Sequence, residues 1–263
     1  MSYLVSISEY EQRFSNRLVR PPNPKSASHK FASDGSVKPY YGLTCIALID
    51  QKSETFQKLC DSQQTFINEL EAAGLKDYFA FLKPESFHMT MCDVNASSDS
   101  DRCFNATLIE IVQDAFQSIG APGKIVAQLR GIGLHTTITA LVKFYDEREL
   151  HKVLEIEHQI KEPLQNLPAE AQQANCVQTR EFSGHISLAY CVRQPEEKDA
   201  ERIRVILRAY ENQDLGTALF SQVTLTYFTD MNTYTPILTL NLNDGTILRH
   251  SSNIEMFKNT GSE

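Results

Sequence analysis

The sequence predicts an α+β fold built from a duplicated unit, with two pseudo-symmetric antiparallel sheets, flanking helices and a central cleft between two lobes. The first observation is a strand, helix, strand order that occurs twice, with strand starts near residues 42 and 87 in one unit and 136 and 184 in the next. The second is a tetrapeptide pattern shared by the two closing strands. A chain of 263 residues, 41% of them hydrophobic, can form a core of the required size.

The individual elements follow from the spacing of apolar residues. A spacing of three to four residues predicts helices, and β-rich apolar runs bounded by turn residues predict strands. The helices are expected at residues 7–19, 55–73, 106–118 and 147–164. The strands are expected at residues 42–49, 86–94, 124–129, 136–144, 184–191, 222–228 and 236–242, and the last two form a hairpin through Asp230 and Asn232.

The chain divides into an N-terminal helix and basic arm at residues 1–39, a single bilobal domain at 40–250 and a tail at 251–263. The arm holds six basic and three acidic side chains, whereas the whole chain has a net charge of −8. Such an arm could lie over an anion-binding cleft, or it could be a solvated segment docked on an acidic body. Both interpretations stay open at this point.

Composition limits the partners and the compartment. No apolar run approaches the roughly 18 residues of a membrane span, so no membrane partner is expected. Six cysteines without a Cys-x-x-Cys pair favour reduced thiols, in the cytoplasm or alternatively the nucleus. The acidic balance disfavours long nucleic acid as a ligand. We expect a monomer.

Two histidine motifs carry the functional prediction. A histidine followed two residues later by a hydroxyl residue occurs four times, at His88, His135, His185 and His250. Apolar residues flank the hydroxyl on both sides only in HMTM, which begins at His88, and in HISL, which begins at His185. These two copies also occupy equivalent places in the repeated unit, so position selects the same pair as pattern.

The spacing within each motif suits acid/base chemistry on a phosphate group. Residues i and i+2 of a strand share a face, so His88 and Thr90 point the same way, as do His185 and Ser187. If a pseudo-twofold axis relates the lobes, both faces meet in the cleft. A neutral imidazole can then accept a proton, a protonated one can donate it, and the hydroxyls can hold non-bridging oxygens. Such a site can cleave a phosphodiester without a metal.

With these residues the sequence resembles the two-histidine (2H) phosphoesterases, which include 2′,3′-cyclic phosphodiesterases, RNA 2′-5′ ligase-type esterases and 2′-5′ oligoadenylate phosphodiesterases. The resemblance spans roughly residues 40–242. Besides the two motifs it rests on LKPESFHMTM as the lead-in to the first motif, KIVAQLRGIGLHTTITALVKF as a central hairpin and FSQVTLTYFTDMNTYTPILTLNL as a closing hairpin.

The resemblance implies that His88 and His185 are the catalytic pair and that Thr90 and Ser187 bind the phosphate. In plant-type cyclic phosphodiesterases a tyrosine follows the second motif histidine by five residues, and Tyr190 stands at that position. A regular strand would turn Tyr190 away from His185. Its place in the substrate site therefore requires a bulge or a strand end.

Tyrosines near the predicted cleft strands are candidates for stacking on a nucleotide base. They are Tyr40, Tyr41, Tyr227 and Tyr234. Tyr41 is included in the predicted substrate site. Tyr227 alternates with apolar residues of its strand and therefore fits the core better.

A zinc site is the alternative chemistry. By strand parity Cys92 shares the face of His88 and Cys191 shares that of His185, so these four side chains could form a zinc tetrahedron. Structural zinc sites usually take ligand pairs from tight turns and not from strand positions four and six apart. We therefore expect no metal and no cofactor.

The sequence thus predicts a cyclic phosphodiesterase that hydrolyses a small nucleotide-like 2′,3′-cyclic phosphodiester or the end of an RNA. One alternative is a phosphodiesterase that cleaves 2′-5′ or 3′-5′ bonds in short RNA. The other is a non-catalytic protein that binds nucleotides or RNA ends. The paired motifs disfavour this second alternative, because a binding protein has no need of two imidazoles.

Overall fold

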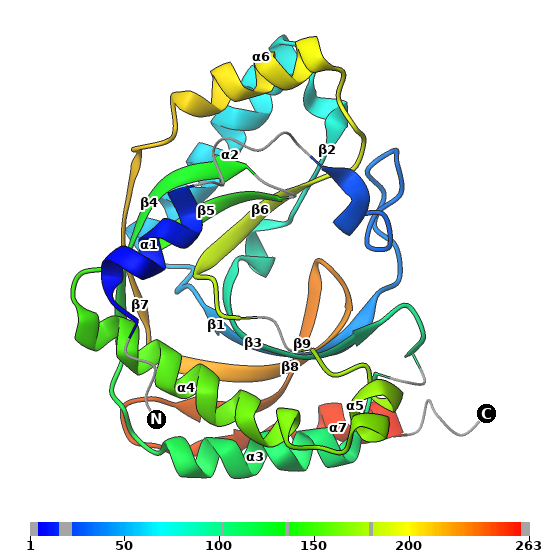
Figure 1. Ribbon diagram of the computed structural model, residues 1–263, viewed down its shortest axis with the longest axis vertical. Coiled ribbons are helices and arrows are strands. Elements are labelled where there is room, and N and C mark those ends of the chain that lie inside the picture. Colours follow the sequence, from blue (N-terminus) through cyan, green and yellow to red (C-terminus); the bar gives the residue numbers. More distant parts are fainter. Residues whose placement is uncertain (1–4, 16–22, 101–102, 135–136, 179–180, 259–263) are drawn as a thin grey trace.

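A computed structural model describes residues 5–15, 23–100, 103–134, 137–178 and 181–258 (Figure 1). The end of the first expected helix at residues 16–19 and His135 lie outside these ranges. The helices of the described part are α1 (Ile7–Ser15), α2 (Glu54–Ala72), α3 (Ala106–Ile119), α4 (Glu147–Gln165), α5 (Ala169–Ala174), α6 (Glu197–Arg208) and α7 (Ser251–Lys258), with short 3-10 turns at Pro24–Ser26, Lys76–Tyr78 and Pro84–Ser86.

The strands form one antiparallel sheet. Its strand order is β10-β9-β8-β1-β3-β6-β5-β4-β7, and β2 pairs with β6 beside this path. The strands are β1 (Tyr41–Leu48), β2 (Phe79–Phe81), β3 (His88–Ser97), β4 (Ile125–Leu134), β5 (Thr137–Phe144), β6 (His185–Cys191), β7 (Asp214–Phe220), β8 (Gln222–Asp230), β9 (Thr233–Asn241) and β10 (Ile247–Arg249). The predicted α+β class and the hairpin of the last long strands, β8 and β9, are confirmed.

The sheet consists of two similar halves that meet at the motif strands. In one half β3 pairs with β1, which pairs with β8; in the other, β6 pairs with β5, which pairs with β4. Only one residue pair, Met89 with Ile186, joins β3 to β6. The two expected sheets are therefore continuous at a single point, and the motif histidines precede the joined residues on both strands.

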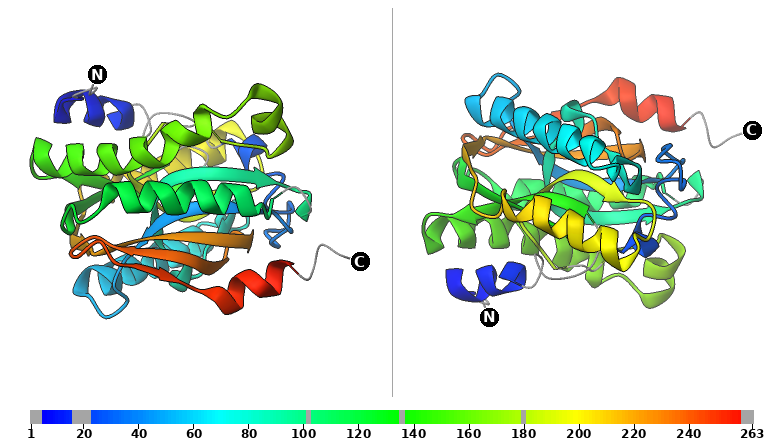
Figure 2. Two further views of the ribbon diagram at one scale, coloured as in Figure 1. Left: turned by 90° about the horizontal axis from the view of Figure 1, so that it is seen from below. Right: turned by 90° about the horizontal axis from the view of Figure 1, so that it is seen from above.

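The helices exchange between the halves. The α2 helix follows β1 in sequence, yet it packs against β7 and α6 of the other half. Ser53 caps its first turn by accepting a hydrogen bond from the Phe56 amide, and Leu59, Phe66 and Leu70 form its buried stripe. Conversely, α4 follows β5 and contacts β4 and β5, but it also lies against β3 and α3 of the other half (Figure 2). The sequence repeat is thus a repeat of strands and not of two independent lobes.

The N-terminal helix packs against the sheet next to the second motif. Tyr10 of α1 is 1% exposed, and its hydroxyl donates a hydrogen bond to the Val142 carbonyl at 3.0 Å. Its ring lies 5.4 Å from that of Phe144 and 6.2 Å from that of Phe182. The segment before β1 also packs inward, with Phe31 buried. Both parts of the expected arm therefore contact the bilobal body.

Some elements carried no clear sequence signal. The α6 helix, the three-residue strands β2 and β10 and the strand β7, which contains Gly216 at φ 96°, were not predicted. The β4 strand extends to Leu134, five residues beyond the expected end. None of the helices in the described ranges is long and apolar enough to cross a membrane.

Candidate active site

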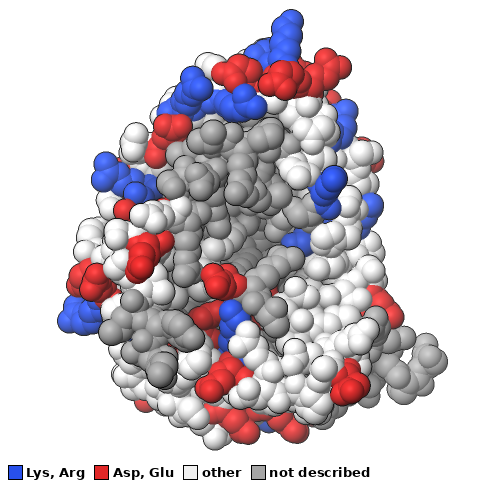
Figure 3. Space-filling view, viewed as in Figure 1, with Lys and Arg blue, Asp and Glu red and all other residues white. Residues whose placement is uncertain are grey.

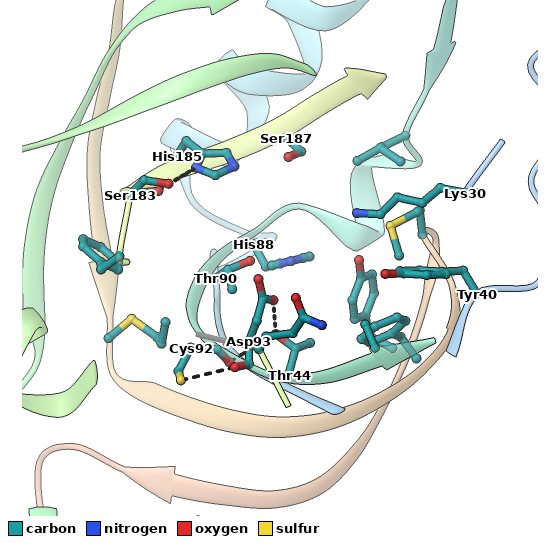
Figure 4. Close-up of a pocket in the computed structure, with 18 of the residues that line it drawn as sticks. Lys30, Tyr40, Thr44, His88, Thr90, Cys92, Asp93, Ser183, His185 and Ser187 are labelled. Carbon is teal, nitrogen blue, oxygen red and sulfur yellow. Dashed lines mark hydrogen bonds between the residues drawn. The ribbon is translucent and has the colours of Figure 1, made fainter. Parts of the chain in front are cut away.

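A pocket opens where β3 and β6 meet, and the two motifs face each other across it (Figure 4). His88 and Thr90 project from β3, while His185 and Ser187 project from β6. Aromatic side chains from the closing hairpin and a lysine from the N-terminal arm complete the wall. The pocket is lined by Lys30, Tyr40, Thr44, Leu82, His88, Thr90, Met91, Cys92, Asp93, Ala96, Gln178, Glu181, Phe182, Ser183, His185, Ser187, Tyr190, Phe228, Met231 and Tyr234.

Both imidazoles are oriented in the same way. Nδ1 of His88 lies 2.7 Å from the carbonyl oxygen of Ser86, and Nδ1 of His185 lies 2.5 Å from that of Ser183. A carbonyl can only accept, so each Nδ1 carries the hydrogen and donates it. Nε2 is then the nitrogen left for proton transfer in both rings. Each contact joins the histidine to the residue two positions before it in sequence. The motifs are therefore equivalent in geometry as well as in sequence.

The hydroxyls of Thr90 and Ser187 point into the pocket. Within the described ranges neither hydroxyl makes a hydrogen bond, although both line the pocket. The alternating residues Met89 and Ile186 are fully buried and anchor their strands in the core. Two hydroxyl groups therefore stand in the pocket as free donors, next to two oriented imidazoles.

Each motif strand contains a β-bulge at the same place. The pairing of β3 with β1 skips Met91, and the pairing of β6 with β5 skips Leu188. Both extra residues stand three positions after the motif histidine. A bulge with one extra residue reverses which face the following side chains occupy. The motif strands therefore change parity at equivalent points.

These bulges bring the fifth residue after each histidine into the pocket. Tyr190 follows His185 by five and lines the pocket, so the condition that the sequence placed on this residue is met. Asp93 follows His88 by five and lines the pocket in the same way. Its Oδ1 accepts a hydrogen bond from the Thr44 hydroxyl at 3.3 Å. Asp93 was not predicted as a site residue.

The structure separates the four candidate tyrosines. Tyr40 and Tyr234 line the pocket, whereas Tyr41 and Tyr227 do not. Tyr227 is 5% exposed and belongs to the core, as expected. Tyr41, which the sequence placed in the substrate site, does not line this pocket, because β1 faces the pocket with Thr44. Tyr41 stands an odd number of residues from it and therefore lies on the opposite face of the strand.

His88 lies in an aromatic and charged surrounding. The ring of Tyr234 meets it edge-on, with centroids 4.6 Å apart. Burial lowers the pKa of His88 below its ordinary value; the hydrogen bond to Ser86 and the charge of Asp93 oppose this effect, and Lys30 adds to it. His88 therefore favours its neutral form near neutrality, which is the form that accepts a proton.

The bulge in β6 removes one of the four side chains of the considered zinc site, since His88, Cys92 and His185 line the pocket but Cys191 does not. Cys191 is fully buried and does not line the pocket, so the expectation that it shares the face of His185 is wrong. Burial raises the pKa of the Cys191 thiol to about 12, which disfavours the thiolate that zinc requires. In the described part of the chain no group of three or more His, Cys, Asp or Glu side chains could hold a metal ion.

The comparisons with known proteins agree with this architecture. The family model described as "2H-phosphodiest: Domain of unknown function (DUF1868)" matches residues 30–108, which include the first motif. The structure is similar to solved structures of Escherichia coli LigT bound to 3′-AMP (TM-score 0.50, 11% identity, 77% of this chain and 98% of that one) and of a phosphoesterase (TM-score 0.51, 13% identity, 77% and 98%). The chain has the 2H phosphoesterase fold.

A third similar structure is that of a conserved protein of unknown function from Agrobacterium tumefaciens. It has a TM-score of 0.53 and 16% identity, over 83% of this chain and 92% of that one. A comparison with curated protein sequences gave no match. The resemblance to the 2H phosphoesterases that the sequence indicated is confirmed. Because the sequence identities are low, the similarity to these solved structures shows the fold alone.

Proposed function

We propose that this chain is a metal-independent phosphodiesterase that hydrolyses a small, nucleotide-like 2′,3′-cyclic phosphodiester. The observation that carries the proposal is the pair of equivalent motifs in one pocket. Each motif presents an imidazole with its Nδ1 bound to a carbonyl two residues upstream, and a hydroxyl without a partner in the described ranges. If the two motifs had only a structural role, their hydroxyls would not need to face one pocket without a partner.

The reaction needs one proton acceptor and one proton donor. Neutral His88 takes a proton from water through Nε2, and the water oxygen attacks phosphorus. Protonated His185 donates its Nε2 proton to the ribose oxygen that leaves as the cyclic P–O bond breaks. The product is a phosphate monoester with one free ribose hydroxyl, and the pair has exchanged one proton. The lowered pKa of His88 favours this assignment of roles.

The remaining side chains suit the charge that develops on phosphorus. The hydroxyls of Thr90 and Ser187 can donate to the two non-bridging oxygens, where negative charge accumulates in the transition state. Every proton and every phosphate oxygen then has a partner among the described side chains. The mechanism calls for no metal ion, and we propose none.

A small nucleotide is favoured as the ligand. E. coli LigT, which shares this fold, has been solved with 3′-AMP, NADP+ or ATP bound. In Figure 3, Lys and Arg side chains are interspersed with Asp and Glu side chains over the described part of this face, and the described residues form no continuous basic surface there. Long nucleic acid is bound by extended basic surfaces, so this face suits a compact ligand better.

The proposal is tested by an activity screen in the presence of EDTA. The substrates are 2′,3′-cyclic nucleotides, 2′-5′ and 3′-5′ dinucleotides and ADP-ribose cyclic phosphate, with products identified by phosphorus NMR. We expect hydrolysis of the cyclic phosphates, lowered about 10² to 10⁴-fold in His88→Ala or His185→Ala. The matched control is His158→Ala, because the His158 side chain on α4 is 60% exposed and outside the pocket.

The outcomes separate the alternatives. Cleavage of a 2′-5′ or 3′-5′ dinucleotide with inert cyclic phosphates would keep the mechanism and replace the substrate. Nucleotide binding without turnover of any substrate would favour the non-catalytic alternative. Full activity of a folded His88→Ala protein would contradict the two-histidine mechanism itself.

A further inference from the structure

Residues 27–38 of the N-terminal arm form a compact turn that packs against the pocket. Ala27 and Phe31 are buried, and Phe31 forms an isolated β-bridge with Val37. The amide of Lys38 donates to the carbonyl of Lys30 at 2.8 Å and closes the turn. The ring of Phe31 lies 5.1 Å from that of Tyr190 in the pocket wall. The backbone on both sides of Lys30 is therefore anchored.

This anchoring directs the Lys30 side chain into the pocket. Its ammonium nitrogen lies 5.1 Å from the ring centroid of Tyr190 and 5.4 Å from that of Tyr40. Figure 4 shows it extending from the arm toward the side of the pocket that holds His88 and Ser187. Cation–π contacts at these distances hold the ammonium in place, and within the described ranges its three N–H donors stay unused.

No acidic side chain among the described residues neutralises the positive charge of Lys30. Among the described residues it has no ion pair and no hydrogen bond to its ammonium group, although Asp93 lines the same pocket. Other lysines near acidic groups do form such pairs, for example Lys152 with Glu149 at 2.9 Å and Lys161 with Glu157 at 2.9 Å. An oriented ammonium group without a counter-ion, in a half-enclosed pocket, is an anion site.

We propose that Lys30 is a substrate-binding residue whose ammonium group binds a phosphate oxygen of the ligand in the pocket. The proposal rests on the proposed function, since it assigns a further contact to the same ligand. It gives the basic arm a role: the arm completes the pocket, and the tyrosines hold the cation ready before the ligand arrives. Tyr190 and Tyr40 then act on the phosphate through Lys30 and are not a stacking surface for a base.

The direct test is equilibrium binding of adenosine 3′-monophosphate by calorimetry, at two salt concentrations, to wild type, Lys30→Met, Lys30→Arg and Lys25→Met. We expect Lys30→Met to weaken binding about 10-fold or more and to reduce its salt dependence. Lys30→Arg should retain part of the affinity. Lys25 is an exposed lysine of the same arm outside the pocket, so Lys25→Met removes the same charge and should bind as wild type does.

A purely structural role of Lys30 is separated by a ligand without phosphate. If Lys30 only held the two tyrosines in place, Lys30→Met would weaken binding of adenosine and of adenosine 3′-monophosphate by the same factor, and that result would overturn the proposal. The result we expect is a loss confined to the phosphorylated ligand. Equal binding of adenosine 3′-monophosphate by wild type and Lys30→Met would overturn it as well.

Kinetics show which phosphate Lys30 binds. With adenosine 2′,3′-cyclic phosphate and its 5′-phosphorylated form as substrates, an equal drop in kcat/KM for both assigns Lys30 to the scissile phosphate. A drop for the 5′-phosphorylated substrate alone would show that Lys30 does not contact the scissile phosphate and would contradict the proposal. If wild type binds the monophosphate but hydrolyses nothing, the proposed function fails while the Lys30 proposal is still decided by the binding data.

Discussion

Gly184 is the residue directly before the second motif, and its missing side chain makes room for α1. A Cβ atom built on Gly184 would lie 2.2 Å from the hydroxyl oxygen of Tyr10, 3.2 Å from Cβ of Val142 and 3.3 Å from Cζ of Phe182. The φ angle of Gly184 is not positive, so alanine is compatible with the backbone and the cost is one of space. We predict that Gly184→Ala forces Tyr10 out of its site.

The magnitude follows from two terms. Displacing the Tyr10 hydroxyl breaks its 3.0 Å hydrogen bond to the Val142 carbonyl, which costs about 1 kcal/mol. Overpacking a close-packed core typically costs about 1–3 kcal/mol more. The free energy of unfolding should therefore fall by about 2–4 kcal/mol in Gly184→Ala. Since His185 is the next residue, kcat/KM should fall as well.

A double-mutant cycle isolates the contact. Tyr10→Phe removes the oxygen that the new Cβ would meet and should cost about 1 kcal/mol alone. In the double variant the closest clash is absent, so its loss in the free energy of unfolding should be smaller than the sum of the two single losses by at least about 1 kcal/mol. The assay is urea unfolding followed by far-UV circular dichroism. Tyr145→Phe, which removes a hydroxyl from an exposed ring, is the control. Additive losses would refute the reasoning.

The other predictions concern the pocket. Burial lowers the pKa of His88 in the folded protein, so the unfolded chain takes up this proton first as the pH falls. The stability that neutral His88 contributes is complete above a pH of about 6.5 and is lost as the pH falls through the folded-state pKa. His88→Asn should therefore flatten the pH dependence of the free energy of unfolding, measured by urea unfolding at pH 5 to 7. Asp93→Asn should lower that pKa further and move the acid limb of the kcat/KM profile to lower pH, whereas the exposed Asp77→Asn should leave it in place. Activity should survive EDTA; one zinc per chain that is lost in Cys92→Ser/Cys191→Ser would contradict this.

Strand parity explains where the sequence succeeded and where it did not. Period-two alternation placed Thr90 and Ser187 beside the motif histidines, and the residues between them in the core. The alternation no longer predicted the face of the residues after Met91 and Leu188. A bulge depends on how a strand pairs with its neighbour, and the local sequence shows no pattern for it. One signal was present: a charged residue, Asp93, stands where a regular strand would face the core.

The long-range contributions had still weaker signals. Lys30 lies in a polar segment without periodicity, 58 residues before His88 in sequence, and the basic charge of the arm left open whether this segment covers the cleft or lies on the acidic body. The packing of α2 against β7 could not be predicted from the sequence either, because an amphipathic pattern shows that a helix has a buried face but not which strands it covers. The sequence placed Tyr41 and not Tyr40 in the substrate site, because the register of β1 with its neighbours cannot be read from the sequence.

The central claim is that His88 and His185 act together in one reaction. The most direct measurement is a double-mutant cycle on kcat/KM, with the hydrolysed substrate of the screen and with His88→Ala, His185→Ala and the double variant. Because an acid and a base that serve one step act as a unit, we predict that the double variant is about as slow as either single variant. Losses that multiply in the double variant, or wild-type rates in either folded single variant, would contradict the account.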